Sequence, residues 1–207
     1  MLDSTGFDLW ADGYDKAVGL SEEKNSYPFA GYKEVLGDIF QKVMTRKNAR
    51  VLDIGFGTGT LTTKLYENGC EIYGQDFSHR MIELAQAKMP NAHLYYGDFT
   101  KGLVQELKDQ RFDFIIGTYS FHHVPNDQKP AFLRSLLMQL NDGGRILIGD
   151  VAFETKDDMN RCAETAGDEW DSDEFYFVAE ELKKEFPQAI FICKSVCAGI
   201  IEIARHV

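Results

Sequence analysis

Between residues 49 and 151, the hydrophobic and polar positions follow two alternating periodicities. Short apolar runs predict strands at residues 49–54, 71–75, 92–96, 112–118 and 145–151. Apolar positions at helical spacing predict intervening helices at residues 58–68, 78–88, 103–107 and 127–140. Strands that alternate with helices pair in parallel through right-handed crossovers. The pattern therefore indicates a doubly wound α/β sheet, in which ligands bind at the carboxyl ends of the strands.

Capping and turn residues indicate where several of the predicted helices and strands begin or end. Ser78 is placed to cap the helix of residues 78–88, and Pro90 ends that helix. Asn126 or Asp127 is expected to cap the helix that follows the fourth strand. The residues 141–144, Asn-Asp-Gly-Gly, predict a turn before the fifth strand.

The two flanks differ from this central region. Residues 7–45 predict two helices, near residues 8–17 and 27–44. Residues 154–185 are acidic and predict one helix, at residues 176–186. Two apolar stretches close the chain, at residues 189–194 and 196–204 with Gly199 between them, and they predict a hairpin-like pair of strands at the sheet edge.

Charge and cysteine content limit the classes of function and the cellular locations that fit this sequence. The 22 Lys and Arg against 33 Asp and Glu give a net charge of −11, which disfavours binding to a nucleic-acid backbone. The cysteines form no C-x-x-C pair, and we expect free thiols, with Cys193 and Cys197 buried in an apolar segment. The start of the chain does not resemble a signal peptide, and no apolar run approaches the roughly 20 residues of a membrane span. These features predict a cytoplasmic protein without membrane contact.

A glycine-rich turn joins the first predicted strand to its helix. It reads Asp53-Ile54-Gly55-Phe56-Gly57-Thr58-Gly59. Glycines in such a turn let a ligand lie against bare backbone, and the following helix start offers unpaired N–H groups. The dinucleotide fingerprint is G-x-G-x-x-G, whereas Thr60 occupies the position of its third glycine. This spacing disfavours a nicotinamide-dependent oxidoreductase.

This turn resembles motif I of the class I S-adenosylmethionine-dependent methyltransferases. Three later segments fit the same family in order and spacing: Asp76 after the second strand, Gly97-Asp98-Phe99 after the third, and residues 118–123 after the fourth. The resemblance implies S-adenosylmethionine as methyl donor, with Asp76 on the ribose hydroxyls and Asp98 on the adenine amine. The donor-binding residues that it implies are Asp53, Gly55, Gly57, Gly59, Asp76, Phe77, Asp98, Phe99 and Ser120.

The resemblance covers residues 47–151 and is closest to small bacterial YrrT-like methyltransferases of unassigned substrate. It implies a mostly parallel, seven-stranded Rossmann-like sheet with helices on both faces and an antiparallel last strand. We therefore expect one methyltransferase domain over residues 1–207. Its parts are a helical cover (1–46), the cofactor-binding core (47–151), a variable acceptor-side segment (152–188) and the last two strands (189–207).

Three residues are candidates for catalysis. His122 and His123 follow the fourth strand, where a neutral imidazole can take a proton from an attacking hydroxyl or amine, although methyl transfer does not require a base. Tyr14, with Trp10, is placed either to cover the cofactor or to pack on the core. The adjacent histidines lack metal-ligand spacing, so no metal site is expected.

The acidic segment is open to two interpretations. Its aromatic residues either line an acceptor pocket or anchor the segment to the sheet: Trp170, Phe175, Tyr176 and Phe177. Its carboxylates are either a solvated face or a site for a cationic acceptor.

The expected function is methyl transfer from S-adenosylmethionine to a small-molecule acceptor, with neither the accepting atom nor the oligomeric state encoded. The alternatives are a non-catalytic cofactor-binding module, a nicotinamide-dependent oxidoreductase and a methyltransferase acting on a macromolecule. Of macromolecules, a protein is the better candidate than nucleic acid.

Overall fold

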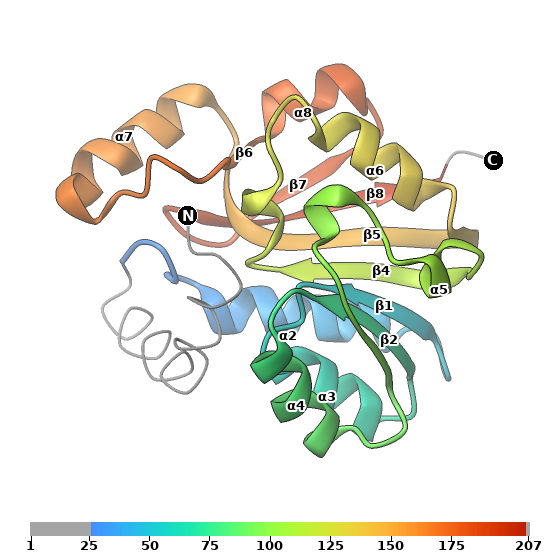
Figure 1. Cartoon of the computed structure of the whole chain (residues 1–207). Coiled ribbons are helices and arrows are strands. Elements are labelled where there is room, and N and C mark those ends of the chain that lie inside the picture. Colours follow the sequence, from blue (N-terminus) through green and yellow to red (C-terminus); the bar gives the residue numbers. More distant parts are fainter. Residues whose placement is uncertain (1–25, 206–207) are drawn as a thin grey trace.

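The computed structural model of the chain describes residues 26–205 (Figure 1). The expected helix at residues 8–17, with Trp10 and Tyr14, lies outside the described residues. Within the described part, no helix combines the length and apolar character that crossing a bilayer requires.

A twisted sheet forms the centre of the described structure. Its strands are β1 (Arg50–Ile54), β2 (Glu71–Asp76), β3 (His93–Tyr96), β4 (Phe112–Thr118), β5 (Leu140–Phe153), β6 (Phe177–Val178), β7 (Ile190–Cys193) and β8 (Ala198–Ala204). Seven of them follow the order β3-β2-β1-β4-β5-β8-β7, and β6 pairs with β5 off this path. β8 runs antiparallel to both neighbours, while the other pairs are parallel. The predicted mostly parallel sheet with a reversed last strand is confirmed.

Helices cover both faces of this sheet, as predicted (Figure 1). They are α2 (Tyr32–Val43), α3 (Thr60–Glu67), α4 (His79–Lys88), α5 (Gln105–Lys108), α6 (Lys129–Leu137), α7 (Lys156–Ala166) and α8 (Ala179–Glu185). Successive strand residues point to opposite faces, so β1 places Val51 in one apolar core, with α2 and α3, and Leu52 in the other, with α6. Burial on both faces explains why the central strands are almost continuously apolar.

Of the two helix caps predicted from the sequence, one is confirmed and one is wrong. Ser78 caps α4, and its hydroxyl accepts the Met81 N–H at 3.1 Å, as predicted. The expected cap of α6 is wrong, because the helix begins after Gln128, and the side-chain oxygen of Asn126 instead accepts a hydrogen bond from Lys129 at 3.0 Å.

The acidic segment departs most from expectation. Its first helix, α7, was not predicted; Thr155 and Asp158 cap it reciprocally, and of its residues only Cys162 is buried. With so little apolar surface to bury, α7 lacks the wide apolar stripe by which helices are recognised. The expected helix at 176–186 starts later, at Ala179, because Phe177 and Val178 pair with β5 instead.

Two predictions for the last strands are corrected. Gly199 lies inside β8, opposite Asp150 of β5, and not between the two strands. All four thiols are free, as expected, but Cys193 is exposed while Cys197 is buried. β7 is the edge strand, and its two end residues, Ile190 and Cys193, are exposed while the two between them are half-buried.

Candidate active site

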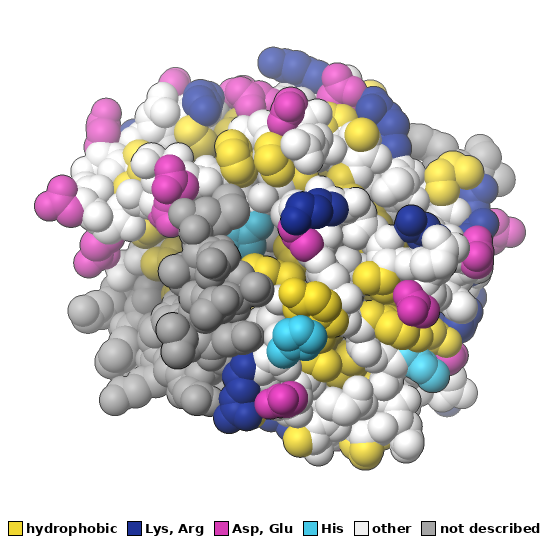
Figure 2. Space-filling model, in the orientation of Figure 1, with side chains coloured by type: hydrophobic (Ala, Val, Ile, Leu, Met, Phe, Trp, Pro, Cys, Tyr) yellow, Lys and Arg dark blue, Asp and Glu magenta, His cyan; other side chains and the backbone are white. Residues whose placement is uncertain are grey.

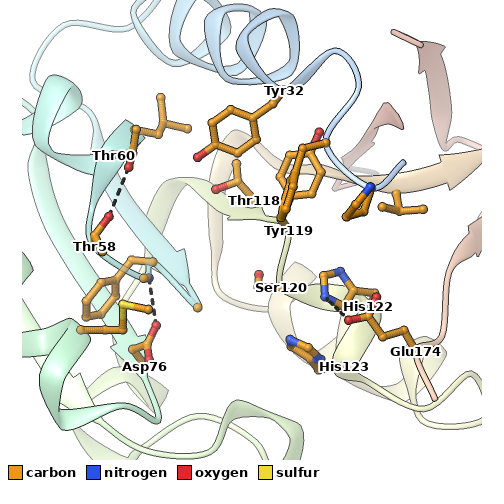
Figure 3. A pocket seen from close by; sticks show the side chains of 18 of the residues that line it. Tyr32, Thr58, Thr60, Asp76, Thr118, Tyr119, Ser120, His122, His123 and Glu174 are labelled. Atoms are coloured by element: carbon orange, nitrogen blue, oxygen red, sulfur yellow. Dashed lines mark hydrogen bonds and ion pairs between the residues drawn. The ribbon is translucent and has the colours of Figure 1, made fainter. Parts of the chain in front are cut away.

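The carboxyl ends of β1 and β4 mark the point where the strand order reverses, and a cavity of about 440 Å³ opens there. Ligands of doubly wound sheets bind at this switch point. Of the predicted donor-binding residues, six line the cavity: Gly55, Gly57, Asp76, Phe77, Phe99 and Ser120. Asp53, Gly59 and Asp98 are not among the lining residues. The structure thus gathers most of the predicted set at one place (Figure 3).

The glycine-rich turn leaves β1 in a conformation that requires glycine. Gly55 and Gly57 have φ values of 70° and 55°, in the left-handed region that L residues rarely adopt. A Cβ at Gly55 would lie 2.5 Å from Cβ of Ser120, whereas a Cβ at Gly57 would meet nothing within 4 Å. Since Gly57 lines the cavity, a side chain there would occupy space next to the turn.

Asp76, at the end of β2, fixes this turn. Its Oδ2 accepts the Gly57 N–H at 2.9 Å, and its Oδ1 accepts the Ser78 N–H at 2.9 Å. The carboxylate is buried and connects the turn to the start of α4. Figure 3 shows Asp76 on the cavity wall below the turn.

Asp53 lies behind the turn, completely enclosed. Its Oδ2 accepts a hydrogen bond from the Thr62 hydroxyl, and its Oδ1 has no hydrogen-bond partner among the described residues. Burial, with the nearby charge of Asp76, raises the pKa of Asp53 to about 7. This carboxyl therefore keeps its proton to a higher pH than an exposed aspartic acid does.

Asp98 and Phe99, two of the predicted donor-binding residues, follow β3 and differ in their relation to the cavity. Asp98 caps a short 3-10 turn, Phe99–Lys101: its Oδ1 accepts the Thr100 N–H at 3.0 Å, and its Oδ2 lies 2.9 Å from Lys101 Nζ. Phe99 is buried and its ring lines the cavity. Asp98 thus lies beside the cavity wall and Phe99 forms part of it.

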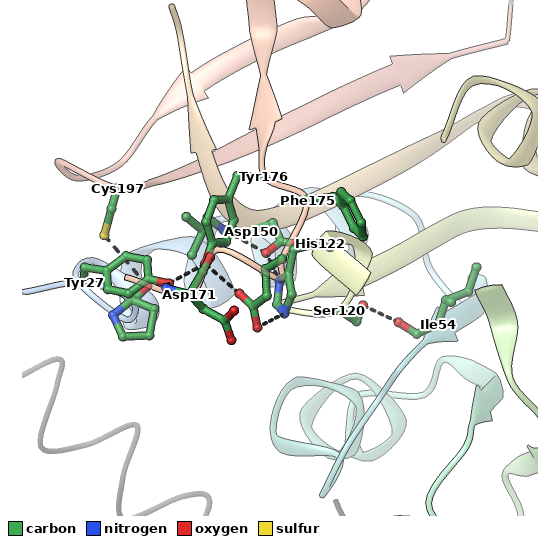
Figure 4. A network of polar contacts seen from close by, with 12 residues as sticks. Tyr27, Ile54, Ser120, His122, Asp150, Asp171, Phe175, Tyr176 and Cys197 are labelled. Atoms are coloured by element: carbon green, nitrogen blue, oxygen red, sulfur yellow. Dashed lines mark hydrogen bonds and ion pairs between the residues drawn. The ribbon is translucent and has the colours of Figure 1, made fainter. Parts of the chain in front are cut away.

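The end of β4 carries the histidines on a second 3-10 turn, Phe121–His123. Before it, Tyr119 has a φ of 52°, and the Ser120 hydroxyl donates to the Ile54 carbonyl at 2.7 Å. That hydrogen bond joins the ends of β4 and β1 across the switch point (Figure 4). Both His122 and His123 line the cavity.

His122 is held between two carboxylates. Its Nδ1 lies 2.6 Å from Oδ1 of Asp150, whose Oδ2 also accepts the His122 backbone N–H at 3.1 Å. Its Nε2 lies 3.4 Å from Oε1 of Glu174. Burial opposes the charged imidazole, but Asp150 outweighs it and raises the pKa of His122 above its usual value.

The pKa of His123 moves in the opposite direction. Its ring centroid lies 4.2 Å from that of His122. Burial and the charge of His122 lower the pKa of His123 to about 3, so this imidazole is neutral at neutral pH. His122, His123 and Glu174 each offer a ligand atom within 4.8 Å of the others, a grouping that can hold a metal ion. Sequence spacing did not indicate it, because Glu174 comes from the acidic segment.

A polar network holds Glu174 in place. The Tyr176 hydroxyl donates to Oε2 of Glu174 at 2.8 Å and is also hydrogen-bonded to the Tyr27 hydroxyl (Figure 4). The Phe175 N–H donates to the His122 carbonyl at 2.8 Å. Residues from three distant parts of the chain thus meet at one end of the cavity.

Sequence reasoning missed Asp150 and Glu174. Asp150 lies inside β5, in a buried and otherwise apolar run, and a lone carboxylate at such a position was a usable signal. Nothing local marks Glu174 among its acidic neighbours. Of the aromatic residues predicted for an acceptor pocket, none lines the cavity; Trp170 stacks on Tyr27 at 5.1 Å and anchors the segment. Tyr27, Phe29 and Tyr32 line it instead.

The fold and this cavity define a class: a doubly wound α/β protein with a cofactor cradle at the switch point. Residues 51–144 match the model of the methyltransferase domain family. The chain is 32% identical over 191 residues to an uncharacterized methyltransferase of Bacillus cytotoxicus, covering 92% of this chain and 84% of that one. It is 34% identical over 180 residues to one of Anoxybacillus flavithermus, covering 87% and 80%.

Solved structures share the fold. Magnesium protoporphyrin IX methyltransferase from Synechocystis PCC 6803 with bound SAH superposes with a TM-score of 0.71 at 17% identity, covering 96% of this chain and 97% of that one. The DhpI–SAH complex superposes with a TM-score of 0.67 at 19% identity, covering 99% and 96%. The chain belongs to the class I S-adenosylmethionine-dependent methyltransferases. It is an enzyme, and S-adenosylmethionine is its methyl donor.

The cavity fits this donor. The open space over Gly57 leaves room for a ligand against the backbone, and Phe77 and Phe99 offer apolar surface. The nicotinamide alternative has no support from these comparisons. The narrower resemblance to YrrT-like proteins stays a prediction.

Proposed function

We propose that the enzyme transfers the methyl group to a small-molecule acceptor, which binds beyond the donor in the same cavity. One observation carries this proposal. A single cavity of about 440 Å³ runs from the glycine-rich turn and Asp76 to His122 and Glu174. Its volume is typical of small-molecule sites, which span roughly 300–1,000 Å³. The donor and a small acceptor then react inside the protein, away from bulk water.

The donor end uses the residues predicted from sequence. Asp76 is the ribose ligand, since a buried carboxylate on the wall can accept from both hydroxyls. Gly55, Gly57 and Gly59 shape the turn, and Asp53 lies beneath it. The remaining members of the set are Phe77, Phe99 and Ser120 on the wall and Asp98 beside it.

His122 is the proposed base. S-adenosylmethionine supplies a methyl group on a sulfonium, so the acceptor needs only a free electron pair and the right position. Positioning alone can supply roughly 7–11 kcal/mol. Asp150 fixes the His122 ring through Nδ1, so that Nε2 is the atom that takes the acceptor proton. The neutral His123 orients the acceptor beside it. Tyr14, the third predicted catalytic residue, lies outside the described residues.

Two alternatives are weaker. The excess of acidic residues disfavours a nucleic-acid acceptor, and Figure 2 shows Asp and Glu side chains gathered around α7, beside the cavity. A non-catalytic binding module would have no use for the Asp150–His122 pair facing the acceptor end. A cytoplasmic location and the single domain over residues 1–207 belong to the same proposal, and the free thiols agree with a reducing compartment.

Calorimetric titration with S-adenosylmethionine, S-adenosylhomocysteine and NAD is the first test. We expect micromolar binding of the first two and none of NAD. Turnover is then measured with methyl-labelled donor and a cell extract separated into metabolites, protein and RNA. Label appearing in the metabolite fraction supports the proposal, and loss of that label in His122→Ala with donor affinity retained supports the base. Label that appears only in the protein or RNA fraction would overturn the proposal of a small-molecule acceptor.

A further inference from the structure

The acceptor end of the cavity is acidic. Glu169, Asp171 and Glu174 line it, with Glu169 and Asp171 at its exposed rim and Glu174 half-buried. Among the described residues, no Lys or Arg side chain lines the cavity. The three carboxylates therefore set a negative potential at the place where the acceptor binds.

Glu174 is the carboxylate that reaches furthest in. Its side chain is 20% exposed, its Oε2 is held by the Tyr176 hydroxyl, and its Oε1 lies 3.4 Å from His122 Nε2. The cation behind it, Lys129, donates to the carbonyl of Phe175 and to Asn126, not to Glu174. Burial also lowers the pKa of Lys129 to about 7. Among the described residues, Glu174 therefore forms no ion pair with a Lys or Arg side chain, and its charged partner is the imidazole of His122 when that ring is protonated.

Aromatic rings form another part of the cavity wall. Phe29, Tyr32 and Tyr119 line the cavity and pack against one another, with ring centroids 5.1–5.9 Å apart. Tyr27 lines it as well, backed by Trp170 at 5.1 Å. Aromatic faces attract cations and also cover apolar groups. Carboxylates beside aromatic rings therefore suit a cation with an apolar body.

The charge change of the reaction distinguishes between acceptors. Methylation of an anionic acceptor removes a negative charge from the acceptor and a positive charge from the sulfonium. Methylation of an amine moves the positive charge from sulfur to nitrogen instead. Carboxylates near the acceptor repel an anionic nucleophile and stabilise positive charge that develops on nitrogen. The observed sign of the site therefore favours an amine over a carboxylate, phenolate or phosphonate.

We propose that the acceptor is an amine with an apolar body, which binds as its ammonium between Glu174 and the aromatic wall. This rests on the proposed function. His122, when deprotonated, takes a proton from the ammonium at Nε2 and becomes the imidazolium that Asp150 stabilises, which frees the electron pair of the acceptor nitrogen. That pair forms the N–C bond as the S–C bond breaks, with the S–C electrons staying on sulfur. The products are a methylated ammonium and neutral S-adenosylhomocysteine.

Matched pairs of probes test the proposal on the full chain saturated with S-adenosylhomocysteine. The amines are phenethylamine, benzylamine and hexylamine, and the acids of the same shape are hydrocinnamate, phenylacetate and heptanoate. Calorimetry is expected to detect binding of at least one amine and of none of the acids. Acids that bind as well as the amines, or no amine that binds, would overturn the proposal. Failure of S-adenosylhomocysteine itself to bind would instead overturn the proposed function.

Two variants distinguish a specific role of Glu174 from an effect of the overall negative charge. Glu174→Gln is expected to weaken amine binding at least about tenfold, while Glu164→Gln, an exposed carboxylate of α7, leaves it unchanged. Unchanged S-adenosylhomocysteine affinity in both variants shows that the fold is intact. Equal amine affinity in Glu174→Gln and the wild type would refute the role of Glu174. Amine binding that is lost on dialysis against EDTA would assign the carboxylate to a metal ion and refute the ammonium site.

Discussion

The buried carboxyl of Asp53 makes the stability of this protein depend on pH in a direction that can be calculated. Its pKa rises from 3.8 in the unfolded chain to about 7 in the fold, mainly because burial disfavours the charged form. The folded state therefore holds its proton more tightly, and stability falls as pH rises between about 4 and 7. This pKa difference lowers the free energy of unfolding by at most roughly 4 kcal/mol, and the full loss is reached above pH 7.

Asp53→Asn removes this titration and retains an oxygen that can accept the Thr62 hydroxyl. The free energy of unfolding, measured in urea with and without the substitution, should therefore diverge with pH. At and below about pH 4 we expect the two proteins to be similar, and near pH 8 the variant to be more stable by up to a few kcal/mol. Asp109→Asn, at an exposed position, is the control and should follow the wild type throughout. A stability difference between Asp53→Asn and wild type that is the same at both pH values would refute the reasoning.

Three further predictions concern the cavity. Asp76→Ala removes the acceptor of two main-chain N–H groups and should weaken S-adenosylhomocysteine binding at least about tenfold by calorimetry; unchanged affinity would contradict its role. Gly57→Ala and Gly143→Ala both place a Cβ in open space at positive φ and should each destabilise the fold by about 1 kcal/mol, but only the first should weaken binding of the same ligand. Asp150→Asn should lower the pKa of His122, seen as a shift of its imidazole NMR titration to lower pH, and an unmoved titration would refute the pairing.

The core of the fold could be predicted because its signals are local. The strands β1 and β4 are short apolar runs, and the side chain of Ser78 caps the helix that follows it. The glycine-rich turn likewise depends on φ values that neighbouring residues determine. Each of these features lies within one segment, so the order of residues along the chain is enough to recognise it.

The acceptor end could not be predicted in the same way. Asp150 reaches His122 because β5 lies beside β4, and Glu174 reaches it because the short strand β6 pairs with β5. Neither contact has a periodicity or spacing that the sequence displays. The sequence alone therefore determined the sheet and the donor cradle, whose interactions are between near neighbours. Only the tertiary structure decided which carboxylates face His122, because that depends on which strand ends the sheet brings together.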